Sequence, residues 1–180
     1  MMLDHANPRA SSDFHMAVIK GLSQGTKSIS PKWLYDAQGS ALFEEITRLP
    51  EYNLTRTETE ILRCNAGLLP SLVPPGGALV EFGSGASVKT RLLLDHGAHF
   101  GAYVPIDISE AFLIHTAIAL RSDYPRLRVL PVVGDFLSPV PFPEILKNRP
   151  KTGFFPGSTI GNIASEDATK LLARARRWSG

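Results

Sequence analysis

The stretch Ala78-Leu-Val-Glu-Phe-Gly-Ser-Gly-Ala-Ser87 constrains the fold of this chain more than any other part of the sequence. Its first half is a short apolar run that ends at Glu81, and its second half carries Gly83 and Gly85. A helical pattern begins at Val88. Glycine lets the backbone take a positive φ and approach a ligand closely, and a helix start offers free N–H groups. A strand, a tight turn and a helix in this order are typical of a nucleotide-binding site.

Strand-like and helical patterns alternate after residue 78 and predict the class of the fold. The expected strands are residues 78–82, 102–107, 128–133 and 153–156, with helices beginning at 88, after Ser109, and at Ser165. Parallel strands joined through helices require right-handed crossovers. We therefore expect α/β architecture, a doubly wound and mostly parallel Rossmann-like sheet. Four strands leave an apolar edge, so we expect truncation after the fourth strand and a missing C-terminal half or partner chain that covers this edge.

The first 75 residues predict helices that precede the sheet. The expected helix caps are Asp13, Ser40 and Thr55. Glu58 lies three residues after Thr55, which is the spacing of a capping box. The Pro-Pro-Gly-Gly run at 74–77 is a clear break. We therefore divide the chain into an N-terminal helical, substrate-binding portion, residues 1–75, and a partial nucleotide-binding domain, residues 76–180.

Composition and charge exclude some function classes. Hydrophobic residues make up 43% and charged residues 20%, which is ordinary for a globular protein. The single cysteine, Cys64, cannot form an internal disulfide and suits a reducing compartment. The sequence has no long apolar run and no signal-peptide pattern. We expect a cytoplasmic protein with no membrane segment. The C-terminal arginines lack interleaved aromatics, so we expect no nucleic acid partner, and the spacing of His96 and His99 predicts no metal site without further ligands.

Polar residues stand where the expected strands end, which is the edge that binds ligands in open α/β sheets. Asp107 ends the second strand and can reach ribose hydroxyl groups. Asp135 follows the third strand and can accept a hydrogen bond from an adenine amino group, while Phe136 can pack on the ring. Together with the glycine turn, these residues predict a site for an adenosine-containing ligand.

The type of nucleoside follows from what the glycine turn lacks. A dinucleotide-binding turn has a third glycine where this chain has Val88, and no phosphate-binding GxxxxGK[ST] motif is present. Glu81 would repel a pyrophosphate but would tolerate a cationic ligand. S-adenosylmethionine carries a sulfonium and an ammonium group. This pattern favours a methyltransferase, and a dinucleotide enzyme and a non-catalytic domain remain as alternatives.

Several segments of the chain resemble the histidine-specific methyltransferase family of ergothioneine synthesis. They are residues 31–43 (PKWLYDAQGSALF), 49–58 (LPEYNLTRTE), 81–94 (EFGSGASVKTRLLL), 104–109 (VPIDIS), 134–136 (GDF) and 157–162 (GSTIGN). The resemblance runs from about residue 13 to residue 180 and rests on the whole set rather than on one motif. It implies that three methyl groups pass in turn from S-adenosyl-L-methionine to the α-amino nitrogen of L-histidine, giving trimethylhistidine (hercynine).

The resemblance also implies roles for individual residues. The positions that match the family's cofactor-binding residues are Gly83, Lys89, Asp107, Asp135 and Phe136. Those that match its histidine-binding residues are Tyr52, Gly157 and Asn162, and Tyr35 matches a catalytic tyrosine near the reacting amine. The chain departs from the family at Asn53, where a second tyrosine is common, and in its length, since the family's C-terminal half supplies further imidazole-binding residues.

Structural interpretations of the same residues remain open at this point. The glycines can simply form a turn, the two aspartates can cap the segments that follow, and Lys89 can be a solvated helix residue. Tyr35 and Tyr52 can be packing anchors, and Asn162 can be a turn residue. Two other functions also remain: methylation of another amino-acid amine, and a non-catalytic fragment.

Overall fold

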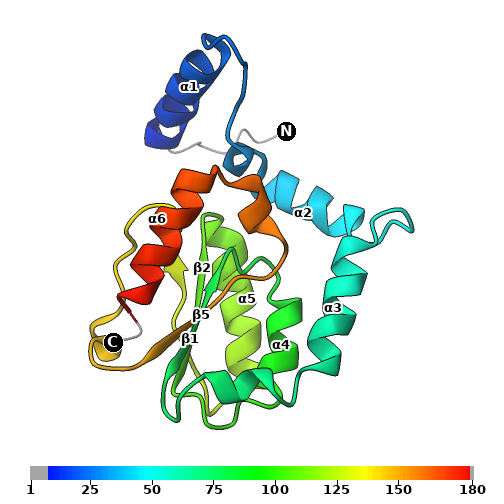
Figure 1. Ribbon diagram of the computed structural model, residues 1–180, viewed down its shortest axis with the longest axis vertical. Coiled ribbons are helices and arrows are strands. Elements are labelled where there is room, and N and C mark those ends of the chain that lie inside the picture. The colour runs from blue at the N-terminus through cyan, green and yellow to red at the C-terminus, as the bar shows by residue number, and fades with distance from the viewer. Residues whose placement is uncertain (1–7, 179–180) are drawn as a thin grey trace.

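A parallel sheet between two layers of helices forms the body of the protein in the computed structural model, which describes residues 8–178 (Figure 1). The central strand β1 (Ala78–Phe82) pairs with β2 (Ala102–Asp107) on one side and with β5 (Lys151–Phe154) on the other. Two short strands, β3 (Arg128–Val129) and β4 (Val132–Val133), also pair with β2. All of these pairs are parallel, which confirms the predicted doubly wound, Rossmann-like α/β class.

The outer strands differ from the sequence-based expectation. One continuous strand over residues 128–133 was expected, but β3 and β4 are separate two-residue strands. Pro131 lies between them and has no N–H to donate to a ladder. The last strand begins at Lys151 rather than at residue 153 and ends at Phe154. The predicted bounds of β1 and β2 are confirmed residue for residue.

Each face of the sheet is covered by a different layer because strand side chains alternate between faces. Leu79 and Tyr103 belong to a buried cluster with α4 (Val88–Leu94) and α5 (Glu110–Asp123). Val80 and Val104 belong to a second cluster, which includes Leu171 of α6 (Ser165–Arg176). In Figure 1, α6 lies on the opposite side of the strands from α4 and α5. The two clusters explain why β1 is buried along its whole length.

The N-terminal third is helical, as predicted, and its last helices pack against the body. Its elements are α1 (Pro8–Leu22), η1 (Pro31–Leu34), α2 (Ala37–Ile46), α3 (Leu54–Cys64) and η2 (Leu69–Leu72). Leu62 of α3 joins the buried cluster beside α4, whereas α1 stands apart from the sheet in Figure 1. Two further short 3-10 helices, η3 (Glu144–Leu146) and η4 (Thr159–Asn162), flank β5. No helix in the described part of the chain combines the length and apolar character needed to cross a membrane.

The predicted helix caps in this third were wrong. α1 begins at Pro8, so Asp13 lies inside the helix. The cap of α2 is Asp36, whose Oδ1 accepts a hydrogen bond from the Gly39 N–H at 2.7 Å, rather than Ser40. α3 begins at Leu54, and the predicted capping box is absent because Glu58 contacts other elements.

Docking of α6 on the sheet can be tested with two adjacent leucines. Leu171 is 1% exposed in the second cluster, whereas Leu172 is 54% exposed. We expect Leu171→Ala to lower the free energy of unfolding by about 2–5 kcal/mol through lost burial and a cavity. The control, Leu172→Ala, should stay within about 0.5 kcal/mol of the wild type. Urea unfolding followed by circular dichroism measures both, and equal losses would contradict this packing.

Candidate functional site

A single cavity of about 860 Å³ lies at the carboxyl ends of the strands. All nine residues singled out from the sequence line it: Tyr35, Tyr52, Gly83, Lys89, Asp107, Asp135, Phe136, Gly157 and Asn162. Tyr35 and Tyr52 come from the connections between the N-terminal helices, and the others come from the glycine turn, the start of α4, the end of β2 and the segments after β4 and β5. Their roles stay predictions, but the structure brings the cofactor-type and substrate-type residues to the same cavity rather than to opposite sides of the molecule.

The glycine turn after β1 is held by the end of β2. The Gly83 N–H donates to the Ile106 carbonyl at 2.9 Å, and the Gly85 N–H donates to Asp107 Oδ2 at 3.0 Å. Gly83 has φ +67°, which a side chain would strain. The hydroxyl of Ser84 is buried, and no hydrogen-bond partner for it exists among residues 8–178. The turn therefore presents backbone and one unsatisfied polar group beside the cavity.

Glu81 is a buried carboxyl group at the floor of this site. It is 1% exposed, lines the cavity and accepts a hydrogen bond from the Tyr103 hydroxyl, which also contacts Ser87 Oγ at 2.9 Å. Burial raises the pKa of Glu81 from 4.5 to about 7, although the hydrogen bond from Tyr103 opposes this. Glu81 is therefore poised between its neutral and charged forms near neutral pH.

The two tyrosines of the N-terminal third are held by Phe43, which the sequence analysis did not single out. The Phe43 ring centroid lies 5.9 Å from that of Tyr35 and 6.1 Å from that of Tyr52, both in edge-on geometry. Burial raises the pKa of Tyr35 above its usual 10.0, and the neighbouring Tyr52 and Asp107 side chains act in the same direction because they disfavour a second negative charge beside them. Its hydroxyl is therefore protonated at neutral pH and is suited to hydrogen bonding rather than to acting as a phenolate.

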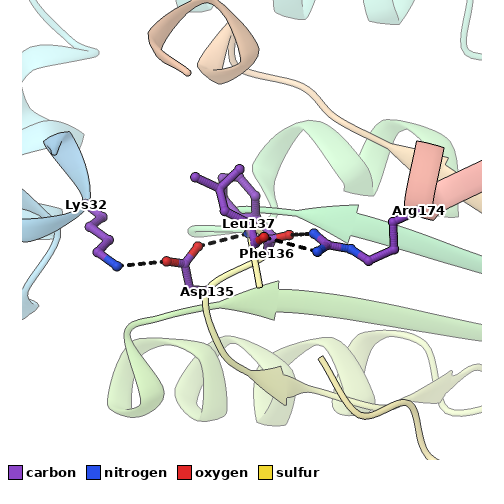
Figure 2. A network of polar contacts seen from close by, with 5 residues as sticks. All are labelled: Lys32, Asp135, Phe136, Leu137 and Arg174. Atoms are coloured by element: carbon purple, nitrogen blue, oxygen red, sulfur yellow. Dashed lines mark hydrogen bonds and ion pairs between the residues drawn. The ribbon is translucent and has the colours of Figure 1, made fainter. Parts of the chain in front are cut away.

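The loop that carries Asp135 is held from two sides (Figure 2). Asp135 Oδ2 pairs with Lys32 Nζ at 2.9 Å, and Oδ1 accepts a hydrogen bond from the Leu137 N–H at 2.9 Å. On the other side, the Arg174 guanidinium donates to the carbonyl oxygens of Leu137, at 3.1 Å, and Phe136. Lys32 comes from η1 and Arg174 from α6, so the N-terminal third and the last helix both position this loop.

Glu58 connects three segments around the cavity and was missed as a site residue. Its Oε2 pairs with Lys89 Nζ near the start of α4, and its Oε1 accepts a hydrogen bond from the Gly157 N–H at 2.7 Å. The spacing of Thr55 and Glu58 predicted a local cap, and nothing in the local sequence distinguishes a capping glutamate from one that reaches another element.

The charges around the cavity are predominantly acidic. The carboxyl groups that line it are Glu44, Glu58, Glu81, Asp107, Asp135 and Asp167, and the lysines are Lys32 and Lys89. Low-dielectric walls strengthen the field of such a cluster. The cavity therefore favours a ligand with positive charge over a phosphate ester, which agrees with the charge argument made from Glu81 alone.

Strand order, glycine turn and acidic cavity together define a Rossmann-like α/β protein built to bind a cationic nucleoside. The chain belongs to the family of histidine-specific, S-adenosylmethionine-dependent methyltransferases, whose family model matches residues 14–180.

Curated relatives agree with this family. The chain is 41% identical to the histidine N-alpha-methyltransferase of Mycobacterium tuberculosis, over 96% of this chain and 55% of that protein. It is 40% identical to the enzyme of the same name from Mycolicibacterium smegmatis, over 85% of this chain and 48% of that protein. The chain thus spans about half the length of these two relatives.

A solved structure supports the fold. The crystal structure of a DUF574 family protein from Streptomyces avermitilis superposes with a TM-score of 0.50. The match covers 92% of this chain and 64% of that protein, at 18% sequence identity.

The buried Glu81 predicts a stability that depends on pH. Its pKa is about 7 in the folded protein against an ordinary 4.5, so the folded state binds a proton more tightly than the unfolded state. Proton binding at Glu81 therefore contributes to the free energy of unfolding. This contribution is fully present below pH 4.5 and is lost as the pH rises through 7, and it amounts to at most roughly 3 kcal/mol. Glu81→Gln cannot ionise, so the free energy of unfolding of the wild type should fall relative to this variant between pH 5 and pH 8.

Urea unfolding at pH 5, 6, 7 and 8 measures this difference. Glu60→Gln, which changes an exposed carboxyl group on α3, is the matched control and should follow the wild type. Parallel curves for wild type and Glu81→Gln across the whole range would contradict the raised pKa.

Proposed function

We propose that this chain carries the S-adenosyl-L-methionine site, and part of the substrate site, of an N-methyltransferase that acts on the α-amino group of L-histidine to give trimethylhistidine. The observation that carries this proposal is the shared cavity. Gly83, Asp107 and Asp135 lie at the carboxyl ends of three neighbouring strands, and Tyr52 and Asn162 line the same cavity. Family membership and the names of the relatives support the same reaction.

The residues around the glycine turn fit the cofactor. Asp107 is suited to ribose hydroxyls, and Asp135 retains lone pairs for an adenine amino group beside its present partners. Phe136 packs with Phe82 and Phe155 and offers an aromatic surface for the base. The buried, unsatisfied Ser84 hydroxyl and the Lys89 ammonium supply polar partners for the amino-acid end of the cofactor.

The side of the cavity that carries Tyr35 and Asn162 suits an amino acid with a reactive amine. The bound cofactor supplies a methyl group made electrophilic by its sulfonium. The protein aligns the amine in line with that methyl group and excludes water. The amine must be neutral when it attacks, and the protonated Tyr35 hydroxyl can accept its N–H and orient its lone pair. The Asn162 amide has both a donor and an acceptor for the substrate's carboxylate or amine.

The same proposal assigns residues 1–75 to substrate binding and residues 76–180 to cofactor binding. Within the described residues β5 pairs with β1 alone, and we infer that further chain or a partner covers its outer edge. An exposed free thiol at Cys64 suits a reducing, cytoplasmic location.

Cofactor binding is tested by isothermal titration with S-adenosylhomocysteine. We expect saturable heat for the wild-type chain, and Asp107→Asn should weaken binding by about tenfold or more because a charge-assisted hydrogen bond to ribose is lost. Asp123→Asn, on the far end of α5, is the control. A folded wild type without detectable heat would refute a formed cofactor site in this chain.

The reaction is tested by incubation with S-adenosylmethionine and L-histidine, followed by mass spectrometry. We expect products with one to three added methyl groups, as the family resemblance implies. Tyr35→Phe should slow product formation by about tenfold through lost amine orientation, with little change in cofactor affinity. Tyr124→Phe, whose hydroxyl contacts Asp95 away from the cavity, is the control. Methylation of another amino-acid amine but not of histidine would reject the substrate, and cofactor binding without turnover would favour the non-catalytic alternative.

A further inference from the structure

We propose that Glu58 is a positioning residue, which holds Lys89 in the cofactor pocket and fixes the loop that carries Asn162. The inference rests on the proposed function, because it assigns Lys89 to the cofactor. Glu58 lies on α3, in the portion of the chain assigned to substrate binding. It thereby couples the two sides of the site through one carboxylate.

The contacts of Glu58 run to two different elements. Glu58 Oε2 forms an ion pair with Lys89 Nζ. Lys89 is the second residue of α4, which begins just after the glycine turn. Oε1 takes the Gly157 N–H at 2.7 Å, ninety-nine positions along the chain. Both oxygens are therefore used, and each is a charge-assisted contact of the stronger kind.

The environment of this pair differs from that of a surface ion pair. The Lys89 and Glu58 side chains are 17% and 23% exposed, whereas those of Arg63 and Glu60, two residues further along the same helix, are 58% and 63% exposed. Exposed pairs contribute little because water screens them. An unrestrained lysine side chain would lose conformational entropy when it binds a ligand. Glu58 restricts the Lys89 side chain before the ligand binds, so less entropy is lost at that step.

Gly157 lies beside Lys89 and opens the segment that carries Asn162. Its φ of +89° belongs to the left-handed region, and a Cβ there would lie 3.8 Å from Lys89 Nζ. Its N–H is occupied by Glu58, so the substrate-side role of Gly157 falls to its carbonyl group and to close approach of the backbone. The short helix η4, which ends at Asn162, follows after Ser158. Fixing Gly157 therefore fixes the start of the segment that carries Asn162.

A double-mutant cycle on S-adenosylhomocysteine binding tests the coupling. Glu58→Gln keeps an acceptor for Gly157 but loses the charge that holds Lys89. We expect it to raise the dissociation constant by about tenfold in the wild-type background, and by less than about twofold when Lys89→Met is already present. Glu60→Gln is the matched control on the same helix and should bind as the wild type does.

The outcomes separate this inference from the proposed function. If the wild type binds and Glu58→Gln binds equally well, or loses the same factor with and without Lys89→Met, then Glu58 does not act through Lys89 and the inference is rejected. If the folded wild type binds no S-adenosylhomocysteine, the proposed function fails first. A merely structural role would lower the melting temperature without this dependence on Lys89.

Amide hydrogen exchange tests the second contact without any cofactor. Peptides that cover residues 155–163 should exchange several-fold faster in Glu58→Ala than in the wild type, because the Gly157 N–H loses its acceptor. Glu58→Gln should stay close to the wild type, since an amide oxygen can replace the carboxylate oxygen. Glu60→Ala should leave these peptides unchanged. Unchanged exchange in Glu58→Ala would overturn the proposed restraint on this loop.

Discussion

The parallel pairing of β1 with a neighbour on each side is the constraint on which the rest of the structure depends. Glu81 is level with Pro105 of β2 and with Phe154 of β5. Parallel strands in register end at the same edge of the sheet, so the glycine turn, Asp107 and the loop after β5 open toward one another. Five consecutive buried residues in β1 fix this register, because a slip of one residue would exchange the two packed faces.

A carboxyl group inside that central strand gives the site its electrostatic character. Desolvation disfavours the charged form of Glu81, and the hydrogen bond from Tyr103 recovers only part of this cost. A positive ligand next to the glycine turn would favour the charged form again. Glu81 thus lowers the stability of the ligand-free protein at neutral pH, and its charged form complements a cationic ligand. Groups with a shifted pKa are common at binding sites for this reason.

The sequence predicts the central strands of the sheet better than it predicts the side-chain contacts between distant elements. β1 and β2 are short apolar runs bounded by glycine and aspartate, and the structure has strands with the bounds that these local patterns predicted. Elements that depend on partners distant in sequence were placed less well. Asp36 rather than Ser40 caps α2, and Pro131 divides a strand that its apolar neighbours favoured. Glu58 satisfied a local capping pattern, but its carboxylate faces Lys89 and Gly157, which only the packing of α3 on α4 brings close.

That packing also explains how a helical segment outside the sheet completes the site. Lys32 reaches Asp135 and Glu58 reaches Lys89, so side chains of the first 75 residues contact two of the proposed cofactor residues. The more exposed Lys32–Asp135 pair contributes at most about 1 kcal/mol, and desolvation offsets much of the attraction in the more buried Glu58–Lys89 pair. They cannot hold the N-terminal helices in place alone, and burial of Leu62 in the core beside α4 supplies the larger share. Apolar contact therefore docks α3, and the ion pairs then align the lysine and loop that face the cavity.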